Sequence, residues 1–414
     1  MSTLHARLAT AYAKFFAIHE IKADPILQLM HGAILLGFLA TFNGWQFNPA
    51  TAVESLNRGH TCWPFFQSCG DWFFLTMGPF GSTQPVFFMA LFGLIMLAGF
   101  FALTQRWAAA HATVLVLFIA KIYLMSINYS YKGNYDYYHT LFTLLYLFAA
   151  HKKFFLQLSL VLCYFLSTAA KIGPTWILGS YFTATTHGLP LVPWGLEPLA
   201  TNLVIVMEML AAWLLFSRNW WLQRSVYAFF IWFHLYSGTL VGFHYPTIVL
   251  PPLMILFYQL RTTPLQAPLS RGSLLGWAVI ALMCLGQSIP KRISGNELLT
   301  MEGNFYGLYM FEANHQCIAQ TIINGQIVRN FYSTNPRNRC DAYDHFFRNK
   351  TRYCNQPHPV ALTLDHSING GPFYRIIDEP NICTLTYQPF SHNSWIKDET
   401  TATPVGIPTK NVYR

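Results

Sequence analysis

Charged side chains are scarce in this sequence. Asp, Glu, Lys and Arg make up 10% of the 414 residues, whereas 53% are hydrophobic. A soluble domain carries about 25% charged residues, so this composition predicts a membrane protein. The formal net charge is +9, but the basic residues are scattered, with no Lys/Arg run and no interleaving with aromatic residues. We therefore interpret the charge as a sign of membrane topology and predict no nucleic-acid partner.

Several motifs of well-known enzyme classes are also missing. The chain has no phosphate-binding loop, no dinucleotide-binding fingerprint, no Ser-His-Asp arrangement and no H-E-x-x-H zinc motif. We expect no cleavable signal peptide, because the first apolar segment is too long and lacks a small-residue cleavage pattern. That segment is expected to remain as the first membrane span.

Long apolar segments recur along the chain, and a helix needs about 20 such residues to cross a bilayer. We expect an all-α polytopic membrane protein with about nine transmembrane helices. The expected spans are 26–43, 85–104, 108–127, 136–150, 154–170, 199–216, 225–242, 246–260 and 273–289. They divide the chain into three regions: an inner amphipathic segment at 1–25, a transmembrane bundle at 26–289 and a small extracytoplasmic C-terminal domain at 290–414.

The basic residues set the expected orientation of these spans. With the N-terminus in the cytoplasm, the inner segments hold Arg7, Lys14, Lys22, Arg106, Lys152, Lys153, Arg218, Arg224, Arg261 and Arg271. The outer loops before the tail hold only Arg58, Lys132 and Lys171. The positive-inside rule favours this orientation, which places the C-terminal tail outside the cytoplasm.

Six of the eight cysteines fall on the expected outer side, where disulfides form. They are Cys62 and Cys69 in the first outer loop, and Cys317, Cys340, Cys354 and Cys383 in the tail. The loop cysteines are a natural local pair, whereas the four tail cysteines allow three pairings that the spacing leaves open. A zinc site that includes His315 and His358 is the competing interpretation. No C-x-x-C spacing supports it, so we predict no metal.

The tail has a pattern of its own. Residues 317–332 have the alternating pattern of two strands on either side of Asn324-Gly325. This dipeptide suits a type I′ turn, so we predict a β-hairpin. Residues 340–352 are expected to form a short helix. The Pro- and Gly-rich remainder is expected to be loop-rich and held by disulfides.

Lys171 stands where an apolar helix at 154–170 runs out into a Gly/Pro-rich loop. An ammonium group at such a boundary loses hydration and can become a base. The alternative is a lysine that snorkels from the helix end into the lipid headgroups.

Polar residues in or beside the other spans are functional candidates by default. Lys121 falls within the third span, where a charge usually faces a partner or a cavity. Asp136 and His139 are three residues apart, so both lie on one face if a helix has begun. An interfacial tyrosine belt with a capping aspartate is the alternative for this turn.

Three more candidates lie further along the chain. Glu208 has apolar neighbours on both sides in the sixth span. A pairing with Lys121 would give it a purely structural use. His234 and His244 flank the end of the seventh span, where Pro246 interrupts the next apolar segment and a cavity lining is tolerated. A lone histidine in a span more often hydrogen-bonds a neighbouring helix.

The order of four segments resembles the vitamin K-dependent γ-carboxylase family, also called HTTM membrane proteins. These segments are Asn134-Tyr-Asp136-Tyr-Tyr-His139, Lys171-Ile-Gly-Pro-Thr-Trp176-Ile-Leu-Gly179, the acidic position Glu208, and Phe233-His234-Leu through Phe243-His244-Tyr-Pro246. Residues 303–310 and the hairpin also fit, so the resemblance runs from about residue 25 to 332. The short tail resembles that of bacterial members, which implies a bacterial inner membrane and a periplasmic tail.

The resemblance implies an enzyme of the carbon–carbon lyase type. In the family a lysine deprotonates a reduced quinone, oxygen then generates a strong base, and a glutamate loses its γ-proton before carbon dioxide is added. Carried over, Lys171 is the base toward a membrane quinol, His139 orients the reacting group, and His234 completes the catalytic set. The residues expected to line the pocket are Trp176, Glu208, His244 and Asp136.

Three function classes remain open at this point. The first is a membrane enzyme with quinol or lipid chemistry in an outward-facing pocket formed by Lys171, His139 and His234. The second is a non-catalytic membrane component that docks onto a membrane or secreted protein through the aromatic loop 44–84 and the tail. The third is a carrier or channel, which the absence of an inverted repeat disfavours. Expected partners are membrane lipid and either a peptide or protein substrate or a complex partner.

Overall fold

The computed structural model describes residues 2–46, 61–72, 74–75, 83–131, 133–180, 189–262, 265–294, 296–309, 313–333 and 340–406. Predictions that concern Arg58, Lys132, Met310 and most of the first outer loop lie outside these ranges. The chain forms two compact units, and each is described by itself. The helical unit comprises Met1–Val53, Phe73–Leu166 and Met207–Cys284, and the tail unit comprises Glu54–Trp72, Ser167–Val206 and Leu285–Arg414.

A helix lies at each of the nine apolar segments. These helices are α3 (Pro25–Gln46), α5 (Thr83–Leu103), α6 (Trp107–Ile127), α7 (Asn134–Phe148), α8 (Lys152–Ala169), α11 (Glu197–Met209, continued by η3, Ala211–Phe216), α12 (Trp220–Val241), α13 (His244–Phe257) and α14 (Leu274–Ile293). Among the described residues, four helices are long and apolar enough to cross a membrane: α3, α5, α6 and Arg271–Ile293. The structure therefore gives a mostly helical chain that suits a membrane, and the count of nine spans stays a prediction.

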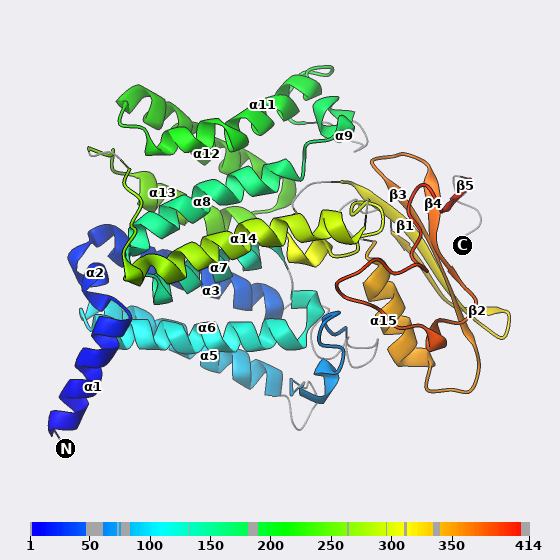
Figure 1. Ribbon diagram of the computed structural model, residues 1–414, viewed down its shortest axis with the longest axis horizontal. Helices are drawn as coiled ribbons and strands as arrows, with labels where there is room; N and C mark the ends of the chain where they lie inside the picture. Colours follow the sequence, from blue (N-terminus) through cyan, green and yellow to red (C-terminus); the bar gives the residue numbers. More distant parts are fainter. Residues whose placement is uncertain are drawn as a thin grey trace. The chain divides into compact units, whose positions relative to one another are not determined.

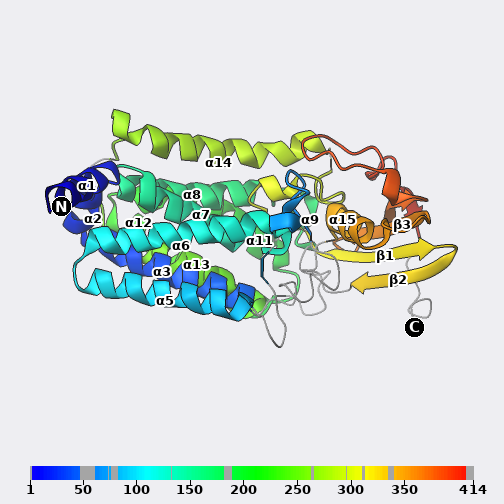
Figure 2. The same ribbon diagram turned by 90° about the horizontal axis from the view of Figure 1, so that it is seen from below.

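Within the helical unit, α3 packs against α5, α7 and α13. Figures 1 and 2 show α5 and α6 side by side, in agreement with their close packing. The most apolar window of α5 is only 22% buried, whereas the corresponding windows of α3 and α6 are 61% and 56% buried. A helix that is apolar all round yet mostly uncovered by protein suits contact with lipid.

The turn between α7 and α8 is closed by charges. The first helices, α1 (Ser2–Phe15) and α2 (Ile18–Ala23), precede the bundle, and α2 supplies Glu20. The Glu20 carboxylate accepts hydrogen bonds from the backbone N–H groups of His151 and Lys152, each at 2.8 Å. Lys152 Nζ donates to the carbonyl oxygens of Leu147 and Ala149 at 3.2 and 3.0 Å. An anion thus satisfies the start of α8 and a cation the end of α7, as helix dipoles favour.

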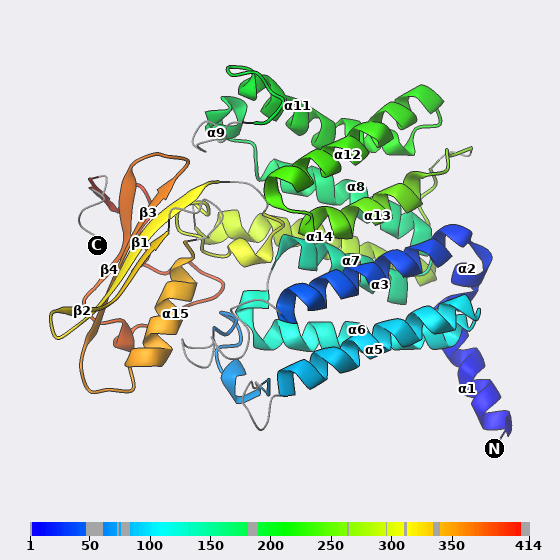
Figure 3. The same cartoon turned by 180° about the vertical axis from the view of Figure 1, so that it is seen from behind.

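The tail unit contains a five-stranded antiparallel sheet in the order β2-β1-β3-β4-β5. Its strands are β1 (His315–Ile323), β2 (Gln326–Ser333), β3 (Val360–Ile368), β4 (Phe373–Glu379) and β5 (Thr403–Val405). Helix α15 (Ala342–Tyr353) lies beside the sheet (Figure 3) and contacts β3. Short helices complete the unit: η1 (Cys69–Trp72), α9 (Pro174–Ile177), η5 (Asn304–Tyr306) and η6 (Ile382–Thr384).

The hairpin and the helix of the tail confirm the sequence predictions. The prediction that the remainder of the tail is loop-rich is wrong in part. Asn324 and Gly325 both have positive φ, 52° and 78°, as a type I′ turn requires. A second hairpin, β3–β4, lies where loops were expected. Its turn also has two residues with positive φ, Asn369 and Gly370, so the same Asn-Gly signal was present there.

Three disulfides hold the tail unit. Cys62–Cys69 is the local pair that the sequence predicts. Among the three pairings left open, the structure has Cys317–Cys340, which joins β1 to the start of α15, and Cys354–Cys383, which joins the end of α15 to η6. These pairs suit the oxidising compartment expected for the tail.

Candidate functional site

A buried charge cluster lies inside the helical unit, formed by Lys121 of α6, Asp136 and His139 of α7, and Thr41 of α3. All four are buried. Lys121 Nζ lies 2.8 Å from His139 Nδ1, 3.2 Å from the backbone oxygen of Asp136 and 3.8 Å from Asp136 Oδ1. Thr41 Oγ1 donates to Asp136 Oδ1 at 3.3 Å. Asp136 and His139 therefore share one face of α7, as their spacing predicts.

The ring of His139 is fixed in one orientation. Its Nε2 lies 2.9 Å from the carbonyl oxygen of Ile34, which can only accept, so Nε2 carries a hydrogen. Nδ1 then accepts from Lys121 in the neutral ring. The ring stands edge-on to Phe38 with centroids 4.5 Å apart, and a Cβ at Gly37 would lie 2.2 Å from it. Both nitrogens of His139 are thus occupied by protein groups.

The partner of Lys121 differs from the one considered from sequence. The structural alternative paired Lys121 with Glu208, whereas the structure pairs it with Asp136. Both members of this pair are 0–1% exposed. A buried pair of this kind is costly to desolvate, and removal of either partner leaves an uncompensated charge.

A second group, the tyrosine cluster, surrounds His234 of α12 in the same unit. Tyr164 of α8 lies 2.6 Å from His234 Nε2 through its hydroxyl, and the Tyr245 ring lies 5.5 Å from the His234 ring. Tyr138 of α7 packs against Tyr245 with centroids 5.6 Å apart. Glu208 lies within electrostatic range of the Tyr164 and Tyr245 hydroxyls. The structure thus places His234 and Glu208 near the same tyrosines and adds Tyr138, Tyr164 and Tyr245, which were not candidate site residues from sequence.

His244 and His139 belong to different surroundings. His244 is partly exposed at the start of α13 and lies against the Tyr135 ring with centroids 4.5 Å apart. A Cβ at Gly44 would lie 2.7 Å from the His244 ring. The small residue in α3 therefore makes the room for this imidazole, as Gly37 does for His139.

Lys171 belongs to the tail unit, where it meets Trp176. Gly173 and Pro174 begin the short helix α9, and this turn brings the indole back to the lysine. Lys171 Nζ lies 5.4 Å from the Trp176 ring centroid, and the two residues are only 3% and 4% exposed. An enclosed lysine of this kind differs from one that snorkels into headgroups. Because the units are described separately, the pocket of Lys171, His139 and His234 stays a prediction.

Metal-ligating groups do not gather within the described part of the chain. No set of three or more His, Cys, Asp or Glu residues is placed there to hold a metal ion. The zinc alternative for the tail is wrong, because all four tail cysteines pair as disulfides. His315 Nδ1 instead lies 3.0 Å from His366 Nε2.

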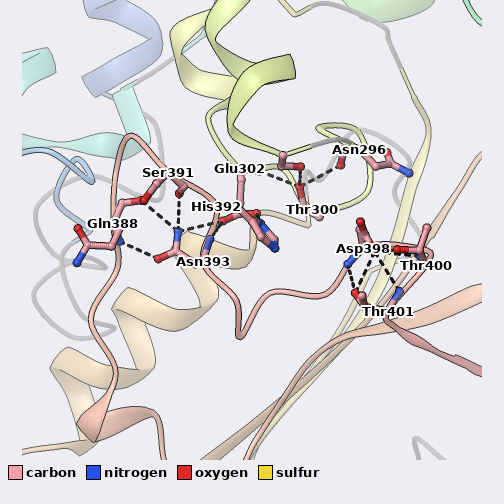
Figure 4. Close-up of polar contacts among 11 residues, drawn as sticks. Asn296, Thr300, Glu302, Gln388, Ser391, His392, Asn393, Asp398, Thr400 and Thr401 are labelled. Carbon is pink, nitrogen blue, oxygen red and sulfur yellow. Dashed lines mark hydrogen bonds and ion pairs between the residues drawn. The ribbon is translucent and has the colours of Figure 1, made fainter.

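The tail unit also buries a carboxylate that nothing in the sequence marked. Glu302 is 1% exposed and accepts hydrogen bonds from the backbone N–H and the side-chain Nδ2 of Asn393, at 2.8 and 2.9 Å, and from His392 Nδ1 at 2.7 Å (Figure 4). Burial raises the pKa of Glu302, an effect that these donors oppose. Asn393 also donates to the carbonyl oxygens of Gln388 and Ser391. The segment around Asn393 is thereby held onto the chain beyond α14.

Acid is expected to destabilise the sheet through His366. This histidine is fully buried, donates from Nδ1 to the carbonyl oxygen of Leu299, and its pKa is lowered by burial and then by His315 to about 3. Below pH 6.5 the unfolded chain therefore binds more protons than the folded chain. The free energy of unfolding decreases as the pH is lowered, by roughly 3 kcal/mol at pH 4.5. Hydrogen exchange of the β1 and β3 amides in the full chain at pH 7 and 4.5 measures this loss. His366→Gln should flatten the profile and the exposed His358→Gln should not; equal profiles for all three chains would contradict the assignment.

Comparisons with known proteins give no relative. No protein-family model, no curated protein and no solved structure matches the chain. The resemblance to γ-carboxylases therefore rests on the four sequence segments, and their chemistry enters only as a proposal.

Proposed function

We propose that this chain is a multi-pass membrane enzyme of the HTTM type that acts on a membrane quinol, with Lys171 as the base. In this proposal nine helices span the membrane, the N-terminus is cytoplasmic and the tail is periplasmic. Four helices of spanning length and three disulfides in the tail unit support the topology.

The enclosure of Lys171 against Trp176 carries the proposal. A buried amine beside an indole offers a proton acceptor and a flat apolar surface, the two features that a quinol headgroup requires. In the proposed step a proton passes from a quinol hydroxyl to Lys171 Nζ and leaves a quinolate. Carboxylation of a glutamate, the reaction of the carboxylases, enters only through the resemblance.

Oxidation of menaquinol by dissolved oxygen tests this step. Menaquinol and oxygen give menaquinone and hydrogen peroxide, and the quinolate reacts faster than the quinol. We expect the protein in nanodiscs to accelerate this oxidation, followed by absorbance, and Lys171→Ala to lower the rate about 100-fold, toward that of empty nanodiscs. Lys171→Arg should also fail, because a guanidinium stays protonated.

Lys153→Ala is the matched control, since Lys153 is partly exposed and pairs with Asp24 at 3.1 Å. This variant should oxidise menaquinol as fast as the unaltered chain. A Lys171→Ala protein that is correctly folded and equally fast would end the enzyme proposal.

A non-catalytic assembly component is the second candidate, and strand β2 favours it. This edge strand exposes Ile327, Val328 and Tyr332 by 55%, 45% and 49%. Edge strands with exposed apolar side chains pair readily with another chain. A native membrane partner that co-purifies with the unaltered chain and with Lys171→Ala, but not with Val328→Asp, would support this function over the enzyme.

A further inference from the structure

The segment 172–206 of the tail unit is almost without charge. The structure describes 172–180 and 189–206 of it. Among Asp, Glu, Lys and Arg the segment holds only Glu197. Glu197 is 2% exposed, and its carboxylate accepts a hydrogen bond from the backbone N–H of Gly195 at 2.7 Å. The surface of this segment therefore presents no carboxylate, ammonium or guanidinium group.

Large apolar side chains are exposed on the same segment. Leu178, Leu191, Trp194 and Leu199 are 68%, 88%, 80% and 67% exposed. Single exposed apolar residues are normal on a soluble protein, and they need no explanation. Four large ones within 22 positions, with no exposed charge among them, indicate a surface that contacts something other than water.

The helical elements of this segment, α9 and the start of α11, are joined closely. Asn202 Nδ2 of α11 donates to the carbonyl oxygen of Ile177, the last residue of α9, at 2.8 Å. Gly179 has a φ of +71°, and a Cβ there would lie 2.7 Å from the backbone nitrogen of Pro198. Glycine suits both the conformation and the close approach. The end of α9 thus lies against the start of α11 (Figure 1), and exposed side chains from both belong to one apolar surface.

The chemistry of this surface suits a lipid bilayer more than a protein partner. A protein interface surrounds its apolar core with a polar rim, and this segment has no exposed charge to contribute to one. Tryptophan prefers the depth of the lipid headgroups, and Trp194 lies in the turn that leads into α11. Helix α11 is one of the nine apolar segments, and Leu199 and Leu203 are exposed on it. The apolar surface therefore continues along a helix that we expect to span the membrane.

We propose that the surface around Leu178, Leu191 and Trp194 is immersed in the lipid bilayer and anchors the tail unit to it. The occupant of the surface is phospholipid. The Gly/Pro-rich loop after Lys171, which the sequence placed outside the membrane, is then part of the membrane contact. Lys171 directly precedes this segment, so the anchor holds the enclosed lysine at the bilayer, where a lipid-soluble molecule reaches it without crossing water. The inference goes beyond the proposed function, because contact with lipid requires no quinol chemistry.

A photoreactive amino acid in the full chain tests this contact. p-Benzoylphenylalanine replaces Leu178 or Leu191. On illumination its ketone takes a hydrogen from a neighbouring C–H group, and the two carbons join, so no atom is lost. The protein is illuminated in nanodiscs of dioleoylphosphatidylcholine and, separately, in native-type membranes, and the adducts are identified by mass spectrometry. We expect phospholipid adducts at both positions, in about ten-fold higher yield than at a water-facing position, since only a probe in the bilayer is surrounded by acyl chains.

Two further probe positions calibrate the yield. Ile327 on strand β2 is 55% exposed and belongs to the same unit, so it is the matched water-facing position. Met96 on the apolar helix α5 is 74% exposed and is the lipid-facing reference. Trp194→Asp should lower the phospholipid yield at Leu178 about five-fold, because a carboxylate is costly to place in lipid. Lys171→Ala should leave that yield unchanged.

The outcomes separate this inference from the proposed function. Phospholipid adducts at Leu178 and Leu191 support the inference, whether or not the oxidation of menaquinol depends on Lys171. Yields no higher than at Ile327 overturn it. Adducts to a second copy of the chain or to another protein, in place of lipid in the native-type membranes, also overturn it and make this surface a docking site. Lipid adducts together with a Lys171→Ala protein that oxidises menaquinol at the full rate end the enzyme proposal alone.

Discussion

Replacement of Lys121 by methionine is expected to destabilise the helical unit by about 3–5 kcal/mol, because it leaves Asp136 as an uncompensated buried charge. Methionine keeps the length and apolar stem of the lysine, so the loss reports the ammonium group and not a cavity. The free energy of unfolding in mixed micelles, from a denaturant titration followed by tryptophan fluorescence, measures the effect.

The double variant Lys121→Met/Asp136→Asn is the decisive comparison. Removal of both charges should restore most of the lost stability, since a neutral pair no longer demands compensation in the protein interior. Lys153→Met is the matched single variant, because Lys153 and Asp24 form a partly exposed pair worth about 1 kcal/mol or less. A Lys121→Met protein as stable as Lys153→Met would show that the buried pair carries no such energy.

Removal of the Cys317–Cys340 disulfide is expected to cost the tail unit about 3 kcal/mol. The bridge spans 23 residues of sequence, and closing a loop of that length removes entropy of this order from the unfolded chain. Because the bridge ties β1 to the start of α15, its loss should appear as faster hydrogen exchange in β1 and α15 of the Cys317→Ser/Cys340→Ser chain.

Cys284 provides the control for this experiment. It is an exposed cysteine outside the three disulfides, so Cys284→Ser should leave exchange in the sheet unchanged. Treatment of the unaltered chain with reductant opens all three disulfides, so it should accelerate exchange in the sheet at least as much as the double variant does. Identical exchange before and after reduction would mean that the sheet is held by its core alone.

Local signals in the sequence predicted most of the elements. Each apolar segment became a helix, because length and composition decide that choice within one segment. The Asn324-Gly325 turn fixed the first hairpin for the same reason. The matching turn at Asn369-Gly370 is harder to recognise because Pro and Gly residues around it favour loops, although strands of alternating pattern flank it.

Partners across helices could not be predicted in the same way. Lys121 fits Glu208 and Asp136 equally well on sequence, because the rotation of each helix about its axis depends on packing with its neighbours. Glu302 and Asn393 carry no motif, and the two residues are 91 positions apart. The tyrosine cluster draws one residue from each of several helices, so no single segment reveals it.

The carboxylate that caps α8 has a consequence for biosynthesis. Glu20 leaves the ribosome 131 residues before His151, so the N-terminal segment waits until helices α3, α5, α6 and α7 have been made before this contact can form. Nascent chains stopped before His151 should therefore leave Glu20 open to labelling or proteolysis, and chains stopped well beyond α8 should protect it. The N-terminal segment would then pack against the bundle late in biosynthesis, only after the α7–α8 turn has been completed.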